Sequence, residues 1–280
     1  MDNIINRYLS NVVLGQLRQF RNMGLVPLFN SLNHGPDYLT LGEASALNYL
    51  TVTEAEPNGA GPRFRLMNRL PMPVLALRGS ELKRTIHMRV FAKTILLQEE
   101  SETTIPAKYV EWNGANCNVN EPSGGPAEPK EYLQAFRCVP GQKGLLVTID
   151  GKIVGMDILS REEAYEDLHL QLVKRYATVA VSGRRAYRDG EFHDKAMSFF
   201  KRVAECQERK YPYLGYGLNY QLDGVGVSGA ALVIGRHVIH LSLSWQQSNS
   251  SSVSHVAMSP AVLPRNGLHP ASISREVSLY

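Results

Sequence analysis

The stretch Gly144 to Val154, with the sequence GLLVTIDGKIV, decides the fold of this chain. An apolar run leads into Asp150 and Gly151, and a second apolar run follows them. Because Asp-Gly is favoured in the two-residue loop of a β-hairpin, the stretch predicts a strand, a tight turn and a strand. The pattern returns at Gly229 to Ile239, GAALVIGRHVI, with the turn shifted by one residue. Two antiparallel hairpins are therefore expected in the second half of the chain.

Two helical patterns separate these hairpins. The first covers residues 161–181, where Tyr165, Leu168 and Leu172 recur at helical spacing, and the second covers residues 194–209. A hairpin, two helices and a hairpin predict an α+β fold, in which a largely antiparallel sheet has its helices packed on one face. Strict alternation of strands and helices is missing, which argues against a doubly wound parallel sheet.

The first half of the chain is rich in strand patterns. Short apolar or alternating runs predict strands at 50–54, 64–67 and 74–77, one long strand or two short ones at 84–97, and a strand that begins after Pro106 and ends at Glu111. A stretch rich in Gly, Asn and Pro, residues 114–129, predicts a loop, and Pro129 opens a short helix. A single α+β domain is expected over residues 24–245, with a β-rich part at 24–113 and the two hairpins and their helices at 129–245.

Both ends of the chain differ from this domain. An amphipathic pattern over residues 2–22, followed by Gly24, predicts a helix, so residues 1–23 are expected to form an N-terminal helical extension. That helix either packs on the main domain or docks a second subunit in a homo-oligomer. From Gln246 the chain becomes rich in serine and then contains scattered prolines, so residues 246–280 are predicted to be a flexible tail.

Composition narrows the class of protein. The chain has 280 residues, of which 44% are hydrophobic and 20% charged, as in globular proteins. The net charge is only +4 and both signs are interspersed, so nucleic acid is not expected as a partner. No apolar run approaches the roughly 18 residues of a membrane span, so no membrane partner is expected. The three cysteines, Cys117, Cys138 and Cys206, lie far apart, which argues against a disulfide framework. With an N-terminus that does not resemble a signal peptide, these features predict a cytoplasmic protein.

The sequence contains no motif that supports a bound cofactor or a bound metal ion. Residues 224–229 match GxGxxG, but a strand pattern follows instead of the helix that a dinucleotide site requires. His237 and His240 lie three residues apart on a predicted strand and therefore face opposite sides, which prevents a shared metal ion. His169 lies on the apolar stripe of its helix, where a hydrogen-bonded core histidine is expected. We therefore predict no cofactor and no metal.

Four polar residues in apolar, strand-like surroundings form the best candidate site: Glu81, His87, Arg89 and Glu111. A buried charge without a partner costs free energy, so charges in such a place need a reason. His87 and Arg89 share one strand face, and if the strands pair, Arg89 can bind Glu81 or Glu111 bidentately. Two interpretations stay open. The residues form an ion-pair network that closes the sheet, or a carboxylate left free binds a ligand or acts as a general base.

A family resemblance runs through the same region. It is carried in order by residues 24–29 (GLVPLF), 38–44 (YLTLGEA), 73–77 (PVLAL), 79–82 (GSEL), Arg89, 105–106 (IP), 110–112 (VEW), 132–133 (YL), 151–154 (GKIV) and 222–243. This succession resembles the ARG and rhodanese-phosphatase-superfamily-associated domain family over about residues 24–245. The resemblance implies a prokaryotic protein without an established biochemical activity. Glu81, Arg89 and Glu111 match the family pattern position by position, whereas its neighbouring Lys, Gln, Asn and Cys are replaced.

Three functions are compatible with these observations. The first is a non-catalytic accessory domain that binds a small ligand or a protein partner, because the major catalytic motifs are missing. The second is a hydrolase-like enzyme that uses Glu81 and Glu111, with His87 and, in one version, a metal ion. The third is a structural subunit that oligomerises through the helix at 2–22.

Overall fold

The computed structural model of the chain describes residues 3–32, 35–55, 63–82, 89–106, 110–112, 129–181, 192–212 and 215–245. All of them belong to one compact unit, Met1–Ser250. The predicted tail at 246–280, which contains the second unit, Ser251–Tyr280, lies outside the described residues.

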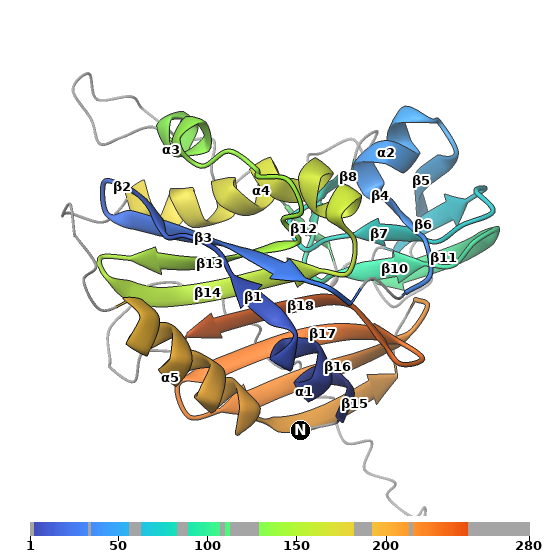
Figure 1. Cartoon of the computed structure of the whole chain (residues 1–280). Coiled ribbons are helices and arrows are strands. Elements are labelled where there is room, and N and C mark those ends of the chain that lie inside the picture. The colour runs from blue at the N-terminus through green and yellow to red at the C-terminus, as the bar shows by residue number, and fades with distance from the viewer. Residues whose placement is uncertain are drawn as a thin grey trace, which may run out of the picture. The chain divides into compact units, whose positions relative to one another are not determined.

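A nine-stranded antiparallel sheet forms the body of this unit (Figure 1). Its strands in spatial order are β1 (Val12–Leu14), β3 (Met23–Asn30), β13 (Gly144–Ile149), β14 (Lys152–Leu159), β18 (His237–Trp245), β17 (Val227–Ile234), β16 (Leu218–Gly224) and β15 (Gln207–Pro212), with β2 (Arg18–Phe20) also paired to β3. Both predicted hairpins are present as β13–β14 and β17–β18. The first turn uses Asp150 and Gly151 with φ of 50° and 74°, the left-handed conformation that Asp-Gly tolerates.

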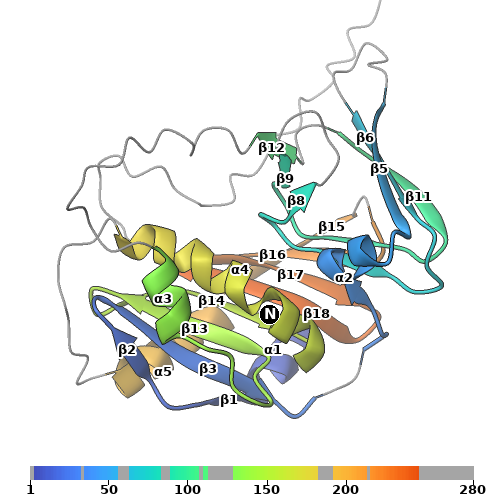
Figure 2. The ribbon, with the colours of Figure 1, turned by 90° about the horizontal axis from the view of Figure 1, so that it is seen from above.

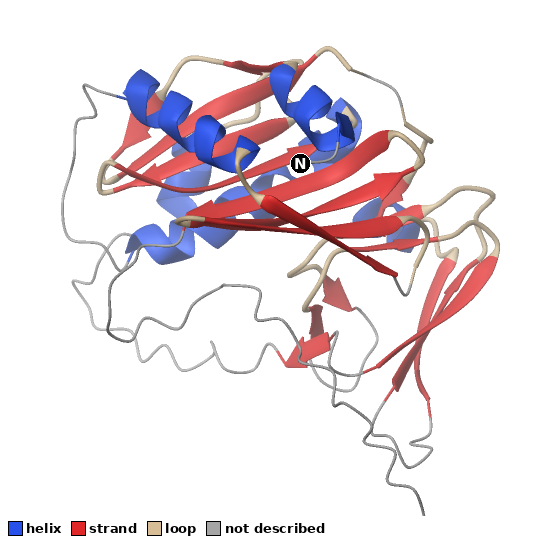
Figure 3. Cartoon of the chain, turned by 90° about the horizontal axis from the view of Figure 1, so that it is seen from below, coloured by secondary structure: helices blue, strands red, loops and turns tan. Residues whose placement is uncertain are grey.

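The helices lie on both faces of this sheet (Figures 1 and 3). They are α1 (Asn3–Ser10), α3 (Pro129–Ala135), α4 (Glu162–Val181) and α5 (Phe192–Ala204), whereas α2 (Leu41–Ala46) packs in the separate core of the small sheets described below. Helices α3 and α4 cover the face that carries Leu145 and Val147, whereas α1 and α5 cover the face that carries Leu146 and Met156. In the part of the chain that the structure describes, no helix has the length and apolar character needed to cross a membrane.

The α+β fold with a largely antiparallel sheet is confirmed, but the expectation that the helices pack on one face is wrong. The reason is visible in β13, all of whose residues are buried. Since successive residues of a strand point to opposite faces, an unbroken apolar run needs cover on both sides.

Three small sheets are inserted between β3 and β13 (Figure 2). Their strands are β4 (Leu39–Thr40), β7 (Val74–Ala76) and β10 (Ile95–Leu97) in one sheet, β5 (Leu50–Ala55), β6 (Arg63–Asn68) and β11 (Ser101–Pro106) in the second, and β8 (Glu81–Leu82), β9 (Arg89–Phe91) and β12 (Val110–Trp112) in the third. Val74 and Ala76 join a separate core with Phe64 and Phe91, whereas Leu75 joins the core under α4. Strand β7 thus ties the small sheets to the large one.

The N-terminal helix is present but much shorter than the predicted 2–22. Helix α1 ends at Ser10, where the Asn11 side chain donates to the carbonyl of Arg7, and β1 and β2 follow. Apolar spacing suits either structure here, and pairing with β3 decides the outcome. Ile5 is fully buried against the sheet, so the apolar face of α1 is covered within the chain. Oligomerisation through this helix stays a prediction.

The second helix is also shorter than predicted. Helix α5 ends at Ala204, and residues 207–209 of the expected helix belong to β15. Strand β15 pairs with β16 along its whole length, from Gln207 to Pro212. Pairing with the sheet therefore overrides the helical pattern at this end.

Candidate functional site

A buried carboxylate, Asp157, lies at the centre of the large sheet. It belongs to β14 and lies between Leu145 of β13 and Ser242 of β18. Its side chain has no exposed surface. Such a charge requires partners, because desolvation of an unpaired carboxylate costs several kcal/mol or more.

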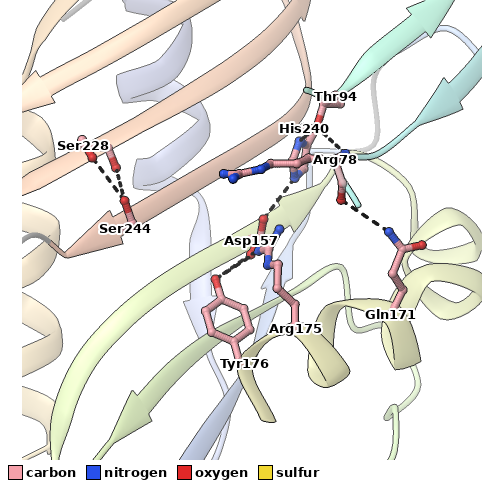
Figure 4. A network of polar contacts seen from close by, with 9 residues as sticks. All are labelled: Arg78, Thr94, Asp157, Gln171, Arg175, Tyr176, Ser228, His240 and Ser244. Carbon is pink, nitrogen blue, oxygen red and sulfur yellow. Dashed lines mark hydrogen bonds and ion pairs between the residues drawn. The ribbon is translucent and has the colours of Figure 1, made fainter. Parts of the chain in front are cut away.

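Three side chains supply those partners (Figure 4). The Tyr176 hydroxyl donates to Oδ2 of Asp157 at 2.6 Å, and Nη2 of Arg175 pairs with the same oxygen. Nε2 of His240 lies 3.3 Å from Oδ1. Both carboxylate oxygens are therefore engaged, by residues that come from α4 and β18.

The balance of these contacts fixes the protonation of the cluster. Burial by itself raises the pKa of Asp157, but the charge of Arg175 and the hydrogen bonds from His240 and Tyr176 outweigh it and lower the pKa below its ordinary value. Burial, together with the nearby Asp157 charge, raises the pKa of Tyr176. Asp157 is thus held ionised and Tyr176 is held protonated.

Local sequence explains how these groups meet. Arg175 and Tyr176 are consecutive on α4, and Tyr176 reaches down to β14 over Gly155. A Cβ atom at Gly155 would lie 2.7 Å from Oη of Tyr176 and 2.8 Å from the carbonyl oxygen of Leu243. The absence of a side chain at this position therefore makes room for the phenol beside Asp157.

A hydrogen-bonded chain extends from the cluster to the small sheets (Figure 4). The backbone N–H of Arg78 donates to Oγ1 of Thr94 at 3.3 Å, and Oγ1 lies 3.3 Å from Nδ1 of His240. A neutral His240 with its proton on Nε2 satisfies both Thr94 and Asp157. Gln171 of α4 bonds both the Arg78 carbonyl, at 3.5 Å, and Oγ of Ser80. The cluster therefore connects the large sheet, α4 and the turn before β8.

The site predicted from the sequence begins at Glu81, next to Ser80, at which this series of hydrogen bonds ends. Strands β8, β9 and β12 pair as the prediction required, and Glu81 and Glu111 both lie opposite Val90 on either side of β9. Arg89 lies opposite Leu82 and Trp112, in the neighbouring row. Glu81 is exposed.

Most side chains of the predicted site lie outside the described part of the chain. His87 falls within residues 83–88, outside the described part of the chain, and the side chains of Arg89 and Glu111 are also outside it. The backbone register brings Glu81 and Glu111 to one row of the sheet. A shared site of the four residues stays a prediction.

Two of the histidines considered for other roles, His169 and His240, have protein partners. His169 is buried, with Nδ1 at 2.9 Å from the Tyr165 hydroxyl and Nε2 at 2.7 Å from the Phe136 carbonyl, which confirms the expected core histidine. His240 belongs to the Asp157 cluster. Among the described residues, no group of three or more His, Cys, Asp or Glu side chains is arranged to hold a metal ion.

The chain matches the model of the family described as ARG and Rhodanese-Phosphatase-superfamily-associated Protein domain over residues 11–113 and 125–244. The chain belongs to this family. The match begins just after α1 and includes the strands and helices that build the Asp157 cluster. Comparison with curated proteins and with solved structures gives no match.

Sequence reasoning missed the centre of this family member's polar network. Asp157 lies in the apolar segment Met156-Asp157-Ile158 and therefore carries the same signal, a charge in a strand, that singled out Arg89. Arg175 lies on α4 outside the predicted apolar stripe, as surface arginines of helices usually do, so the sequence did not mark it as unusual. Only the fold shows that these two residues meet.

Proposed function

We propose that the protein is a non-catalytic accessory domain that binds a ligand, and that Arg175 in the Asp157 cluster contacts this ligand. The ligand presents an oxygen acceptor, either on a small molecule or on a segment of a protein partner. The observation that carries the proposal is the pairing of a fully buried carboxylate, Asp157, with an arginine whose side chain is 26% exposed.

The chemistry of the cluster favours binding over proton transfer. Both oxygens of Asp157 accept hydrogen bonds, and its lowered pKa makes it a weak base. The raised pKa of Tyr176 makes the phenol a weak acid. Because Asp157 stays ionised and Tyr176 stays protonated, they provide a fixed charge and fixed hydrogen bonds that orient Arg175.

Arg175 is the most exposed member of the cluster. Its side chain is 26% exposed, against none for Asp157. Among the described residues, its hydrogen bonds to Asp157 and Tyr176 both use Nη2. The guanidinium keeps further N–H donors in a fixed plane, which suits recognition of carboxylate, carbonyl or phosphate oxygens.

The proposal is tested with a fragment library of organic carboxylates and amides, screened against the full chain by saturation-transfer NMR. We expect fragments whose affinity falls at least about tenfold in Arg175→Gln, the loss of one charged hydrogen bond. The exposed Arg209 provides the matched control, and Arg209→Gln should bind as the wild type does. Fragments that bind both variants equally, or a library without hits, would refute the proposal.

A second candidate, a hydrolase, is favoured by one observation. Glu81 and Glu111 share the row of Val90, so one intervening strand separates them by roughly 10 Å between Cα atoms. Two carboxyl groups can admit a water molecule between them when they lie about 6.5–9.5 Å apart. Hydrolysis of p-nitrophenyl phosphate or p-nitrophenyl glycosides that disappears in Glu111→Gln, with unchanged stability, would support it. Absence of any turnover would end it.

We also propose that this domain functions in the cytoplasm of a prokaryotic cell. Cys138 and Cys206, the cysteines among the described residues, are free thiols, as is usual in a reducing compartment. Cell fractionation of the native host with an antibody against the chain tests the proposal. Recovery of the protein outside the cytoplasmic fraction would contradict it.

A further inference from the structure

Arg18 carries two buried nitrogen atoms that have no hydrogen-bond partner among the described residues. It lies in β2, opposite Leu25 of β3, and its Nη1 donates to the carbonyl of Arg137 at 2.7 Å. Its Nε and Nη2 are closed to solvent and unpaired. Buried polar groups in native proteins are almost always paired, and a charged donor left without an acceptor is costly.

The two unpaired atoms have a specific geometry. Nε and Nη2 lie on one edge of the planar guanidinium, and their N–H bonds point in parallel. This edge matches two oxygens of one carboxylate or phosphate group. The unpaired pair is therefore the part of an arginine that is best suited to hold an oxyanion.

The three side chains on which the charge of Arg18 acts are themselves uncharged, and the carboxylates of Glu166 and Glu162 also act on one of them, Cys138. The positive charge of Arg18 acts on Cys138, Tyr165 and His169. Burial raises the pKa of Cys138 and Tyr165 and lowers the pKa of His169, so all three are neutral near pH 7.

Two of these neighbours, His169 and Tyr165, are hydrogen-bonded to each other. Nε2 of His169 must donate to the Phe136 carbonyl, so a neutral His169 accepts the Tyr165 hydroxyl proton at Nδ1. The Tyr165 oxygen in turn accepts from Nε2 of Gln142 at 2.7 Å. Tyr165, His169 and Gln142 thus bond within a network that leaves Nε and Nη2 of Arg18 without an acceptor.

We propose that Nε and Nη2 of Arg18 bind an oxyanion, a phosphate or a carboxylate, enclosed between β2, the segment after α3 and the first half of α4. The anion supplies both missing acceptors. Because the two nitrogen atoms are closed to solvent, the ion enters through a local opening of this region. The site is separate from Arg175 and does not depend on the function proposed above.

The test uses the full chain with inorganic phosphate and acetate as probes, and sodium chloride at equal ionic strength as the reference. We expect at least one probe to raise the Tm by about 5 °C at about 100 times its Kd. A response to phosphate alone identifies a phosphoryl site, and a response to acetate alone identifies a carboxylate site.

Substitutions locate the response. Arg18→Met should abolish the rise in Tm, and Arg18→Lys, which keeps the charge but loses the fork, should weaken binding at least about tenfold. Arg209→Gln is the control and should respond as the wild type does. Should Arg18→Met not fold, the Arg18→Lys comparison is repeated by titration calorimetry. The proposal is overturned if neither probe exceeds the chloride reference, or if the Arg18→Lys variant responds as strongly as the wild type.

Discussion

Replacement of Asp157 by asparagine tests the energetic role of the central cluster. The substitution keeps the shape of the side chain and removes its charge. Asparagine can still accept from Tyr176 through its oxygen, while its amide donates to Nε2 of His240 after a change of tautomer. What cannot be replaced is the counter-charge of Arg175.

The expected loss follows from that missing charge. Removing one partner of a buried ion pair costs about 3–5 kcal/mol, and the 26% exposure of Arg175 places the value at the lower end, about 3 kcal/mol. Urea unfolding at pH 7 measures it. In an Arg175→Met background the same substitution should cost much less, because no orphaned guanidinium remains.

The pH dependence of this loss has a definite sign. Since the pKa of Asp157 is lower in the folded state, its stabilisation is present above the ordinary value of 3.8 and disappears as the pH falls through the folded value. Asp150→Asn is the control, because Asp150 is exposed and its φ of 50° suits asparagine equally well. A loss below about 1 kcal/mol for Asp157→Asn, the range of surface pairs, would refute the reasoning.

Three further outcomes are expected. Burial lowers the pKa of His169, so as the pH falls the unfolded chain binds a proton at this residue before the folded chain does. The Tm should therefore decrease as the pH drops below 6.5, the ordinary pKa of histidine. The His169→Gln substitution should reduce this dependence of Tm on pH, whereas substitution of the exposed His193 by glutamine should leave it unchanged. Thr40→Ala removes the capping box of α2 and should cost about 1 kcal/mol in urea unfolding, and an unchanged midpoint would contradict the role of the cap. Gly155→Ala forces a Cβ against Tyr176 and should cost about 1–3 kcal/mol; equal stability would show that the sheet yields at this point.

Local signals predicted the elements that depend on local structure. The Asp150-Gly151 turn specified β13–β14, and helical spacing specified α4 to within a residue. The same spacing failed at the N-terminus, because residues 12–14 and 18–20 pair with β3. Tertiary pairing there outweighs a local preference.

The candidate site depends on contacts between distant residues. Asp157 meets Arg175 across 18 positions and His240 across 83. A charge inside an apolar strand marks Asp157 as a residue that needs a partner, but periodicity cannot name that partner. The register of β8, β9 and β12 is likewise fixed by pairing over distance, and it places Glu81 and Glu111 in one row.

The order of strands in the large sheet has a consequence for synthesis of the protein. Strand β18, which leaves the ribosome after all the other strands of the described sheet, lies in the interior between β14 and β17. Until β18 has been synthesised, the backbone N–H and C=O groups on one edge of β14 have no strand to pair with. Closure joins segments far apart along the polypeptide, and such high contact order slows folding. Emergence of β18, rather than of the first hairpin, therefore sets the moment at which the body of the molecule can assemble.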